Sequence, residues 1–238
     1  NLHGTRSLLN AMQRHSCYSI VFSSSATLYG YPKHVPITEG SKINPINPYG
    51  NTKASVECLL SDLSKSENVW RIACLRYFNP VGAHPSGRIG EDPNGVPNNL
   101  FPYVSQVAIG LQPKLEIYGS DWPTKDGTAI RDYIHVMDLA EGHCAALDLL
   151  QNNKPQFITM NLGSGKGYSV LQVINCFEKV IGRKLSYKFA KRRQGDVASS
   201  VADPSFAALK MGWRTTRDLK DMCRDSWNWQ SKNPIGYL

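Results

Sequence analysis

Short apolar segments alternate with helix-like segments in the first third of this chain. Residues 18–22 have the apolar character of a buried strand, and residues 48–65 have the spacing of a long helix that precedes a second buried strand at 69–77. Strands separated by helices pair in parallel, with right-handed crossovers. We therefore predict an α/β fold built on a parallel sheet, which a helix over residues 1–14 also covers.

The later segments continue this pattern after a long loop. Residues 79–99 are rich in Pro, Gly, Asn and His, and an irregular segment of this length is typical of a functional or a disordered region. Beyond the loop, apolar spacing predicts helices at 100–111, 137–150, 170–181, 204–211 and 219–229 and strands at 114–118, 132–136, 157–162 and 184–189.

Tyr49 and Lys53 lie four residues apart in the predicted helix 48–65, so their side chains project from one helix face. A lysine ammonium favours the phenolate form of a neighbouring tyrosine. A phenolate can serve as the general base that hydride chemistry at a carbinol carbon requires. The hydroxyl residues of 23–27 follow a predicted strand, at the edge where open α/β sheets bind ligands. The alternative interpretation of this pair, taken alone, is that both side chains lie on a solvent-exposed helix face and have no catalytic role.

The composition indicates a globular protein with a small anionic ligand. The chain has 238 residues, of which 41% are hydrophobic, and no segment resembles a membrane span or a signal peptide. The six cysteines lack metal-binding spacing, so we expect no metal and buried, reduced thiols in a cytoplasmic protein. The net charge of +8 suggests nucleic-acid binding as one hypothesis. Against it, only residues 191–193 form a basic cluster. A nucleotide diphosphate suits this charge better.

A glycine-rich turn between a strand and a helix cradles the pyrophosphate in dinucleotide-binding α/β enzymes. Residues 163–167, Gly-Ser-Gly-Lys-Gly, follow one predicted strand and precede a helix. Their spacing differs from G-x-G-x-x-G, and no acidic residue ends a second strand about 20 positions later. We expect a tight connection between a strand and a helix there, rather than a phosphate-binding loop.

Several motifs resemble the extended short-chain dehydrogenase/reductase superfamily and, within it, the UDP-glucose 4-epimerase family. The superfamily motifs are residues 1–5, 23–30, Tyr49 with Lys53, and 76–80. The epimerase motifs are residues 82–87, 97–100, 126–128, 131–136, 192–196 and 227–230. They occur in order and cover essentially the whole chain.

The resemblance implies a partial Rossmann-type parallel sheet and a smaller mixed α/β substrate domain. Residues 1–80 would form the carboxyl-terminal part of the NAD-binding domain. Residues 81–238 would mainly bind the UDP-sugar, with elements near 130–150 returning to the Rossmann domain. On this resemblance, the first βα units of the family, on the order of 100 residues, would precede the present sequence. We therefore expect a fragment that is inactive alone. The alternatives to an enzyme are a non-catalytic fragment that binds a nucleotide sugar and a structural or interaction protein that retains only the fold.

The resemblance also implies the reaction, which is the interconversion of UDP-glucose and UDP-galactose through a 4-keto intermediate with bound NAD. Tyr49 would take the proton from the sugar 4-hydroxyl, while Ser25 bonds the 4-oxygen and Thr27 assists. Lys53 would hold the nicotinamide ribose. The family further implies a homodimer formed through a helix bundle that includes residues 48–65.

The remaining site residues are carried over by motif. The positions that match cofactor contacts are Asn1, Ser23, Tyr49, Lys53 and Tyr77. Those that match substrate contacts are Ser25, Phe78, Asn79, Asn99, Leu100, Tyr118, Arg131, Arg193, Asp196 and Ser200. Structural alternatives are a core position for Phe78, a loop cap for Asn79 and an ion pair with Asp132 for Arg131.

Two positions refine the implied reaction. Ala26 follows Ser25 where related dehydratases carry Asp-Glu and UDP-glucuronate decarboxylases carry Glu, so the sequence disfavours both activities. In the family, the position of Ser200 lines the pocket near the sugar C2 substituent. A small serine there predicts that UDP-N-acetylglucosamine and UDP-N-acetylgalactosamine are also accepted. The alternatives are that Ser200 is a plain surface hydroxyl or that a shift of the backbone fills the space.

Overall fold

The computed structural model describes residues 1–95 and 97–237 and separates into two compact units. Unit 1 comprises Asn1–Phe78, Ala140–Gly165 and Ala202–Arg214. Unit 2 comprises Asn79–Leu139, Lys166–Val201 and Thr215–Leu238. None of the helices in the described part of the chain has the length and apolarity needed to cross a membrane.

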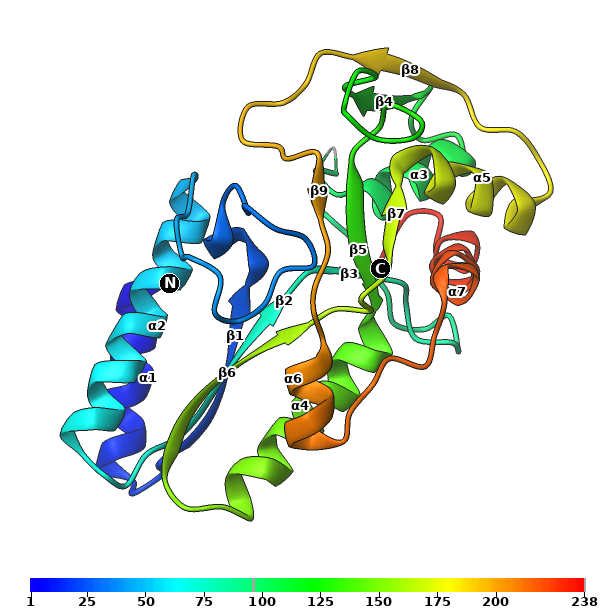
Figure 1. The fold of residues 1–238 in the computed structure, drawn as a ribbon. Helices are drawn as coiled ribbons and strands as arrows, with labels where there is room; N and C mark the ends of the chain where they lie inside the picture. Colours follow the sequence, from blue (N-terminus) through cyan, green and yellow to red (C-terminus); the bar gives the residue numbers. More distant parts are fainter. Residues whose placement is uncertain (96, 238) are drawn as a thin grey trace. The chain divides into compact units, whose positions relative to one another are not determined.

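Unit 1 contains a three-stranded parallel sheet with the order β1-β2-β6. Its strands are β1 (Ser19–Ser25), β2 (Arg71–Tyr77) and β6 (Gln156–Leu162). Its helices are α1 (Leu2–Arg14), the short 3₁₀ helix η1 (Ala26–Tyr29), α2 (Pro48–Ser66), most of α4 (Val136–Gln151) and α6 (Ser205–Met211). Figure 1 shows α1 and α2 together on one side of the strands and α4 and α6 on the other.

The start of α2 is fixed by local chemistry. The side chain of Asn47 accepts a 2.8 Å hydrogen bond from the Gly50 backbone N–H, and Pro48 supplies a preset first-turn dihedral. A side chain at Gly50 would lie 3.0 Å from the Thr27 carbonyl oxygen. Glycine therefore lets the first turn of α2 approach η1 closely. Further along α2, Val56 and Leu60 pack into an apolar cluster with Ile72 of β2.

Unit 2 is organised around β5, which pairs in parallel with β3 and β9 and antiparallel with β7. A separate parallel pair is formed by β4 and β8. The strands are β3 (Asn79–Val81), β4 (Leu115–Tyr118), β5 (Ile130–His135), β7 (Gly167–Ser169), β8 (Tyr187–Ala190) and β9 (Ser199–Ser200). The helices are α3 (Leu100–Ala108), α5 (Val170–Ile181) and α7 (Leu219–Lys232), whose apolar faces share one core with Leu115, Ile117 and Tyr133.

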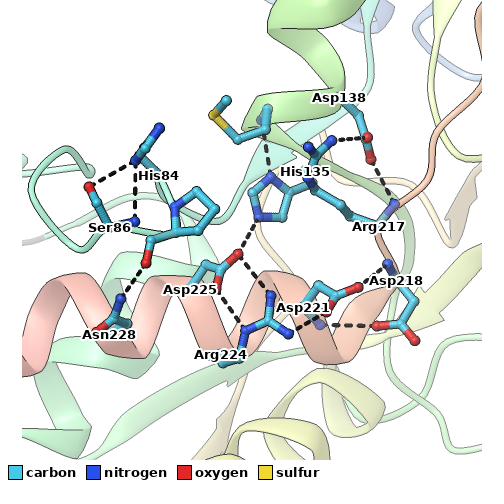
Figure 2. Close-up of polar contacts among 12 residues, drawn as sticks. His84, Ser86, His135, Asp138, Arg217, Asp218, Asp221, Arg224, Asp225 and Asn228 are labelled. Carbon is cyan, nitrogen blue, oxygen red and sulfur yellow. Dashed lines mark hydrogen bonds and ion pairs between the residues drawn. The ribbon is translucent and has the colours of Figure 1, made fainter.

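A buried polar network lies beside α7 in unit 2 (Figure 2). His135 Nδ1 accepts a 3.0 Å hydrogen bond from the Met137 N–H, so the neutral ring carries its proton on Nε2, 3.2 Å from Asp225 Oδ2. Asp138 Oδ1 accepts a 2.5 Å hydrogen bond from Arg217, in the segment that leads into α7. These contacts tie α7 and the segment before it to the end of β5 and the start of α4.

Several sequence predictions need correction at their edges. The strand predicted at 18–22 extends through the serines to Ser25, and β3 lies within the predicted loop 79–99. Residues 163–166 join β6 to β7, so the expected strand-to-helix connection is wrong. The cysteines were expected to be buried, but Cys17, Cys58 and Cys144 are exposed thiols. Helix 170–181 is confirmed with the same bounds, because a capping box starts it and Gly182 in the left-handed region ends it.

Candidate active site

Tyr49 and Lys53 lie on the first two turns of α2, beside the carboxyl end of β1. Lys53 Nζ donates a 2.7 Å hydrogen bond to the Ser23 carbonyl oxygen and lies 5.5 Å from the centre of the Tyr49 ring. Partial burial lowers the pKa of Lys53. The Tyr49 side chain is 52% exposed, so its hydroxyl can be reached by a ligand. The sequence prediction that these two side chains share a helix face is confirmed.

Ser25 and Thr27 form a compact hydroxyl pair where β1 passes into η1. Ser25 Oγ accepts hydrogen bonds from the Thr27 backbone N–H at 3.2 Å and from Thr27 Oγ1 at 2.9 Å. Ser25 thereby caps η1. Because both contacts use the lone pairs of Ser25 Oγ, its own hydrogen can be donated to a ligand oxygen.

Tyr77 differs from Tyr49 in its surroundings. Its hydroxyl donates a 2.7 Å hydrogen bond to Ser23 Oγ and also contacts His143 Nε2. Burial raises the pKa of Tyr77, although the bond to Ser23 opposes the change. Tyr77 is therefore a neutral hydrogen-bonding group and not a base at neutral pH. Its partner His143, on α4, had no signal in the sequence, because a single histidine in a helix has no distinctive spacing.

Asn1 also lies on the α2 side of unit 1, where its Nδ2 donates a 2.8 Å hydrogen bond to Thr52 Oγ1. Phe78 is 7% exposed and packs with Leu28 and Ile37, which is the position of a core residue. Its backbone N–H donates to the Leu162 carbonyl oxygen.

Unit 2 brings five of the predicted substrate residues into one connected group. Asp196 Oδ1 lies 3.4 Å from Arg131 Nη2, and Asp196 Oδ2 lies 3.4 Å from Arg193 Nε. The Arg193 guanidinium lies 4.4 Å from the centre of the Tyr118 ring. Ser200 pairs with Arg131 in the register of β5 and β9. Arg131 thus bonds to Asp196, which is a different partner from the Asp132 that the sequence suggested.

The other predicted substrate residues lie on separate elements of unit 2. Asn99 precedes α3 and donates a 3.3 Å hydrogen bond to Glu91, while Leu100 is half-buried against the apolar core. Arg193 Nη1 lies 3.5 Å from the carbonyl oxygen of Asn98. Asn79 belongs to β3, where it pairs with Tyr133, so it is a strand residue and not a loop cap.

The donors of unit 1 fit the sugar end of a nicotinamide nucleotide. Lys53 presents an ammonium, and the accessible Tyr49 presents a hydroxyl, beside the carboxyl end of a parallel strand. Ribose hydroxyls accept from and donate to such groups. Within residues 1–95 and 97–237, no group of three His, Cys, Asp or Glu side chains could hold a metal ion.

Comparisons with known proteins agree with this geometry. A family profile described as GDP-mannose 4,6 dehydratase matches residues 1–226. The chain is 55% identical to the UDP-glucose 4-epimerase of Bacillus subtilis over 237 residues, which cover 100% of this chain and 70% of the relative. It is 54% identical to the UDP-glucose 4-epimerase of Drosophila melanogaster, with 100% of this chain and 68% of the relative covered.

Solved structures give the same result at the level of the fold. A UDP-glucose 4-epimerase from Stenotrophomonas maltophila, with bound NAD and formylated UDP-arabinopyranose, superposes with a TM-score of 0.96 at 49% identity. The match covers 98% of this chain and 69% of that one. The enzyme from Bifidobacterium longum, in complex with NAD⁺ and UDP, gives 0.95 at 48% identity, with coverage of 99% and 70%. The α/β fold with parallel and mixed sheets is thereby confirmed.

Proposed function

Because this chain belongs to the UDP-glucose 4-epimerase family, we propose that it interconverts UDP-glucose and UDP-galactose by inverting C4 of the sugar. The observation that carries the proposal is the Tyr49–Lys53 pair. Its ammonium is held by the Ser23 carbonyl oxygen and lies 5.5 Å from the phenol ring. This is the arrangement that a proton-transferring tyrosine requires.

Tyr49 exchanges the proton of the sugar 4-hydroxyl. Its phenolic oxygen takes that proton as the C4–H bond is broken and returns it when the bond is re-formed on the other face. Ser25 donates a hydrogen bond to the 4-oxygen, and Thr27 holds Ser25 in place through two hydrogen bonds. Lys53 stabilises the phenolate by its positive charge.

NAD⁺, when bound, supplies hydride acceptance and return at C4. Lys53 and Tyr49 would hold its nicotinamide ribose, and Asn1, Ser23 and Tyr77 would contact the same half of the cofactor. The bond between Tyr77 and Ser23 fixes the orientation of two of these groups.

Arg131 and Arg193 would hold the diphosphate of the substrate. Both guanidinium groups share Asp196, which keeps them together and leaves N–H groups of their forks for phosphate oxygens. Tyr118, under the Arg193 guanidinium, would contact the uracil ring. The remaining contacts of the proposal are Phe78, Asn79, Asn99, Leu100 and Ser200.

Ala26 favours epimerisation over the dehydration that the matching profile describes. Elimination of water from the sugar needs an acid and a base beyond Tyr49. Ala26, which follows Ser25 at the start of η1, carries neither group. We therefore place the chain with enzymes that return the hydride and proton without losing water.

Three broader features belong to the proposal. The NAD-binding domain would correspond to unit 1 and the UDP-sugar domain to unit 2. Exposed Leu2 and Leu8 on α1 and Leu59 on α2 support a homodimer formed through these helices. Six free thiols support a cytoplasmic protein.

The test is conversion of UDP-galactose by the protein expressed from its complete reading frame, with products separated by anion-exchange chromatography. Tyr49→Phe is expected to lower kcat by about 100-fold or more, because no phenolate remains to exchange the proton. Tyr31→Phe is the matched control, since Tyr31 is an exposed tyrosine of the same unit. Full activity in Tyr49→Phe would refute the mechanism, and substrate binding without turnover by the unmodified protein would favour the non-catalytic alternative.

A further inference from the structure

A buried guanidinium lies next to the catalytic elements of unit 1. Arg76 of β2 makes a bidentate ion pair with Glu57 of α2, with Nε 3.0 Å from Oε1 and Nη2 2.6 Å from Oε2. Each of the two side chains is 5% exposed. Burial lowers the pKa of Arg76, but the bond to Glu57 and the nearby charges reverse the effect and hold the group protonated.

Glu57 connects this ion pair to the catalytic helix and to β1. Tyr49, Lys53 and Glu57 are spaced by four residues, so they lie along one face of α2. Glu57 Oε1 also accepts a 2.5 Å hydrogen bond from Ser24 Oγ. Ser24 lies between Ser23, whose carbonyl oxygen holds Lys53, and Ser25. The position of α2 against β1 is thus fixed by a charge-assisted contact.

The other side of the guanidinium connects to η1. Arg76 Nη1 donates to the Tyr29 hydroxyl at 2.9 Å and to the Glu39 carbonyl oxygen at 3.1 Å. Tyr29, which is 2% exposed, passes the chain of hydrogen bonds on to Asn161 Oδ1 at 2.7 Å. Tyr29 is the last residue of η1, the same short helix that holds Thr27 against Ser25.

Stability alone does not call for a charged group at this place. Replacing a buried ion pair by apolar side chains of similar volume is often neutral or stabilising, because the charges lose their hydration on folding. Apolar side chains do not form directional hydrogen bonds. A planar guanidinium that bonds a carboxylate on one edge and a phenol on the other fixes the distance between the segments that carry these groups.

We propose that Arg76 and Glu57 are positioning residues for epimerisation: one guanidinium holds α2, with Tyr49 and Lys53, in register with Ser25 and Thr27. The inference rests on the proposed function. Neither residue exchanges a proton with the sugar. Their effect is to keep the phenolic oxygen and the serine hydroxyl at the spacing that one sugar 4-oxygen can bridge, and a misplacement of about 1 Å can cost on the order of 100-fold in rate.

The principal test is the double variant Glu57→Leu with Arg76→Met. We expect it to remain folded by circular dichroism, with kcat for UDP-galactose reduced about 100-fold and KM unchanged. The matched control is Asp138→Asn with Arg217→Met, which removes an ion pair with a buried carboxylate from unit 2, while asparagine keeps one of the two oxygens that accept from the backbone N–H groups of Thr216 and Arg217. Wild-type kcat in the folded Glu57→Leu, Arg76→Met double variant, or an equal loss in the control, would overturn the proposal.

Tyr29→Phe gives a second test, because it removes one hydroxyl and leaves the ion pair in place. We expect a reduction in kcat of about 10-fold, which corresponds to about 1.4 kcal/mol, because the bonds of this hydroxyl to Arg76 and to Asn161 are both lost. Amide hydrogen exchange at residues 26–29 and 48–53 should become faster than in the unmodified protein. Unchanged kcat together with unchanged exchange would contradict the role of Arg76 even if the double variant did not fold.

Hydrogen exchange also separates the two proposals. If the unmodified protein does not convert UDP-galactose, the proposed function fails. The amide exchange rates at 26–29 and 48–53 then decide whether the guanidinium positions these segments. Rates equal to those of the unmodified protein in both Tyr29→Phe and the double variant would contradict the inference.

Discussion

The ammonium of Lys53 lies 5.5 Å from the centre of the Tyr49 ring while it donates a 2.7 Å hydrogen bond to the Ser23 carbonyl oxygen. The Lys53 side chain therefore supplies the positive charge beside the Tyr49 phenol and also anchors this part of α2 to β1. Partial burial lowers the pKa of Lys53, which makes its ammonium a less strongly hydrated and more effective partner for a phenolate.

Replacing Lys53 by methionine should remove this charge while keeping most of the side-chain volume. We expect kcat for UDP-galactose to fall by about 100-fold or more, because no cation remains beside the proton-transferring phenol. Steady-state rates at saturating UDP-galactose provide the measurement. Lys53→Arg, which keeps a positive charge, serves as the control, and an unchanged kcat in Lys53→Met would argue against the pairing.

Ser25 and Thr27 should contribute unequally. Ser25→Ala removes the hydroxyl that we propose donates to the sugar oxygen, so we expect kcat to fall about 10-fold to 100-fold. Thr27→Val removes only the 2.9 Å bond to Ser25 Oγ and leaves the 3.2 Å bond from the Thr27 N–H, so its effect should be several-fold smaller. The kcat values of the two variants at saturating UDP-galactose decide this, and a larger loss in Thr27→Val would reverse the assignment of the donor.

His135 should make the stability of unit 2 depend on pH. Burial lowers its pKa below the ordinary value of about 6.5, although the hydrogen bond from Nε2 to Asp225 opposes the shift, as does the charge of Asp138, while Arg217 adds to it. Because the unfolded chain binds a proton that the folded ring resists, the stabilising contribution is complete above about pH 6.5 and is lost as the pH falls toward the folded pKa.

Urea unfolding between pH 5 and 7.5 measures this effect. The free energy of unfolding should fall below about pH 6.5, and the slope should be weaker in His135→Asn, whose side-chain oxygen can still accept the Met137 N–H. Asp203→Asn is a suitable control for carboxylate titration, since burial is not its main influence and hydrogen bonds lower the pKa of Asp203. Identical slopes for the unmodified protein and His135→Asn would show that another group is responsible.

The sequence predicted the elements of this fold better than the contacts that join them. Apolar spacing and a glycine stop predicted 170–181 with the right bounds, whereas the strand at 18–22 was predicted too short because three serines looked like a loop. Ser24 belongs to the strand because it pairs with Arg76 in the register of β1 and β2, and its buried hydroxyl is bonded to Glu57. Glu57 itself has the spacing of an ordinary helix residue, and its partner Arg76 is 19 positions away, so local patterns carry no trace of their contact.

The site was predicted in the same uneven way. Spacing alone placed Tyr49 and Lys53 on one face of a helix, because four residues make about one turn. The group of Arg131, Arg193 and Asp196 came from motif resemblance, since it joins residues from β5 and a later loop. His143 was missed, because its contact with Tyr77 depends on the packing of α4 against β2.

Ser200 should determine which sugars are accepted at C2. It lies in β9, paired with Arg131 of β5, and its side chain ends at a single hydroxyl. A small residue beside the sugar leaves room for an N-acetyl group, so we expect turnover of UDP-N-acetylglucosamine as well as UDP-glucose. Ser200→Tyr should lower kcat/KM for the N-acetylated sugar by about 100-fold, because the added ring fills the space by direct overlap. Its kcat/KM for UDP-galactose should change less than about threefold, since the 2-hydroxyl needs no such space.

Ser199→Tyr, at the preceding strand position and therefore on the opposite face of β9, is the matched control. If the unmodified protein does not turn over the N-acetylated sugar, or if Ser200→Tyr affects both sugars equally, Ser200 is not the residue that selects the C2 substituent.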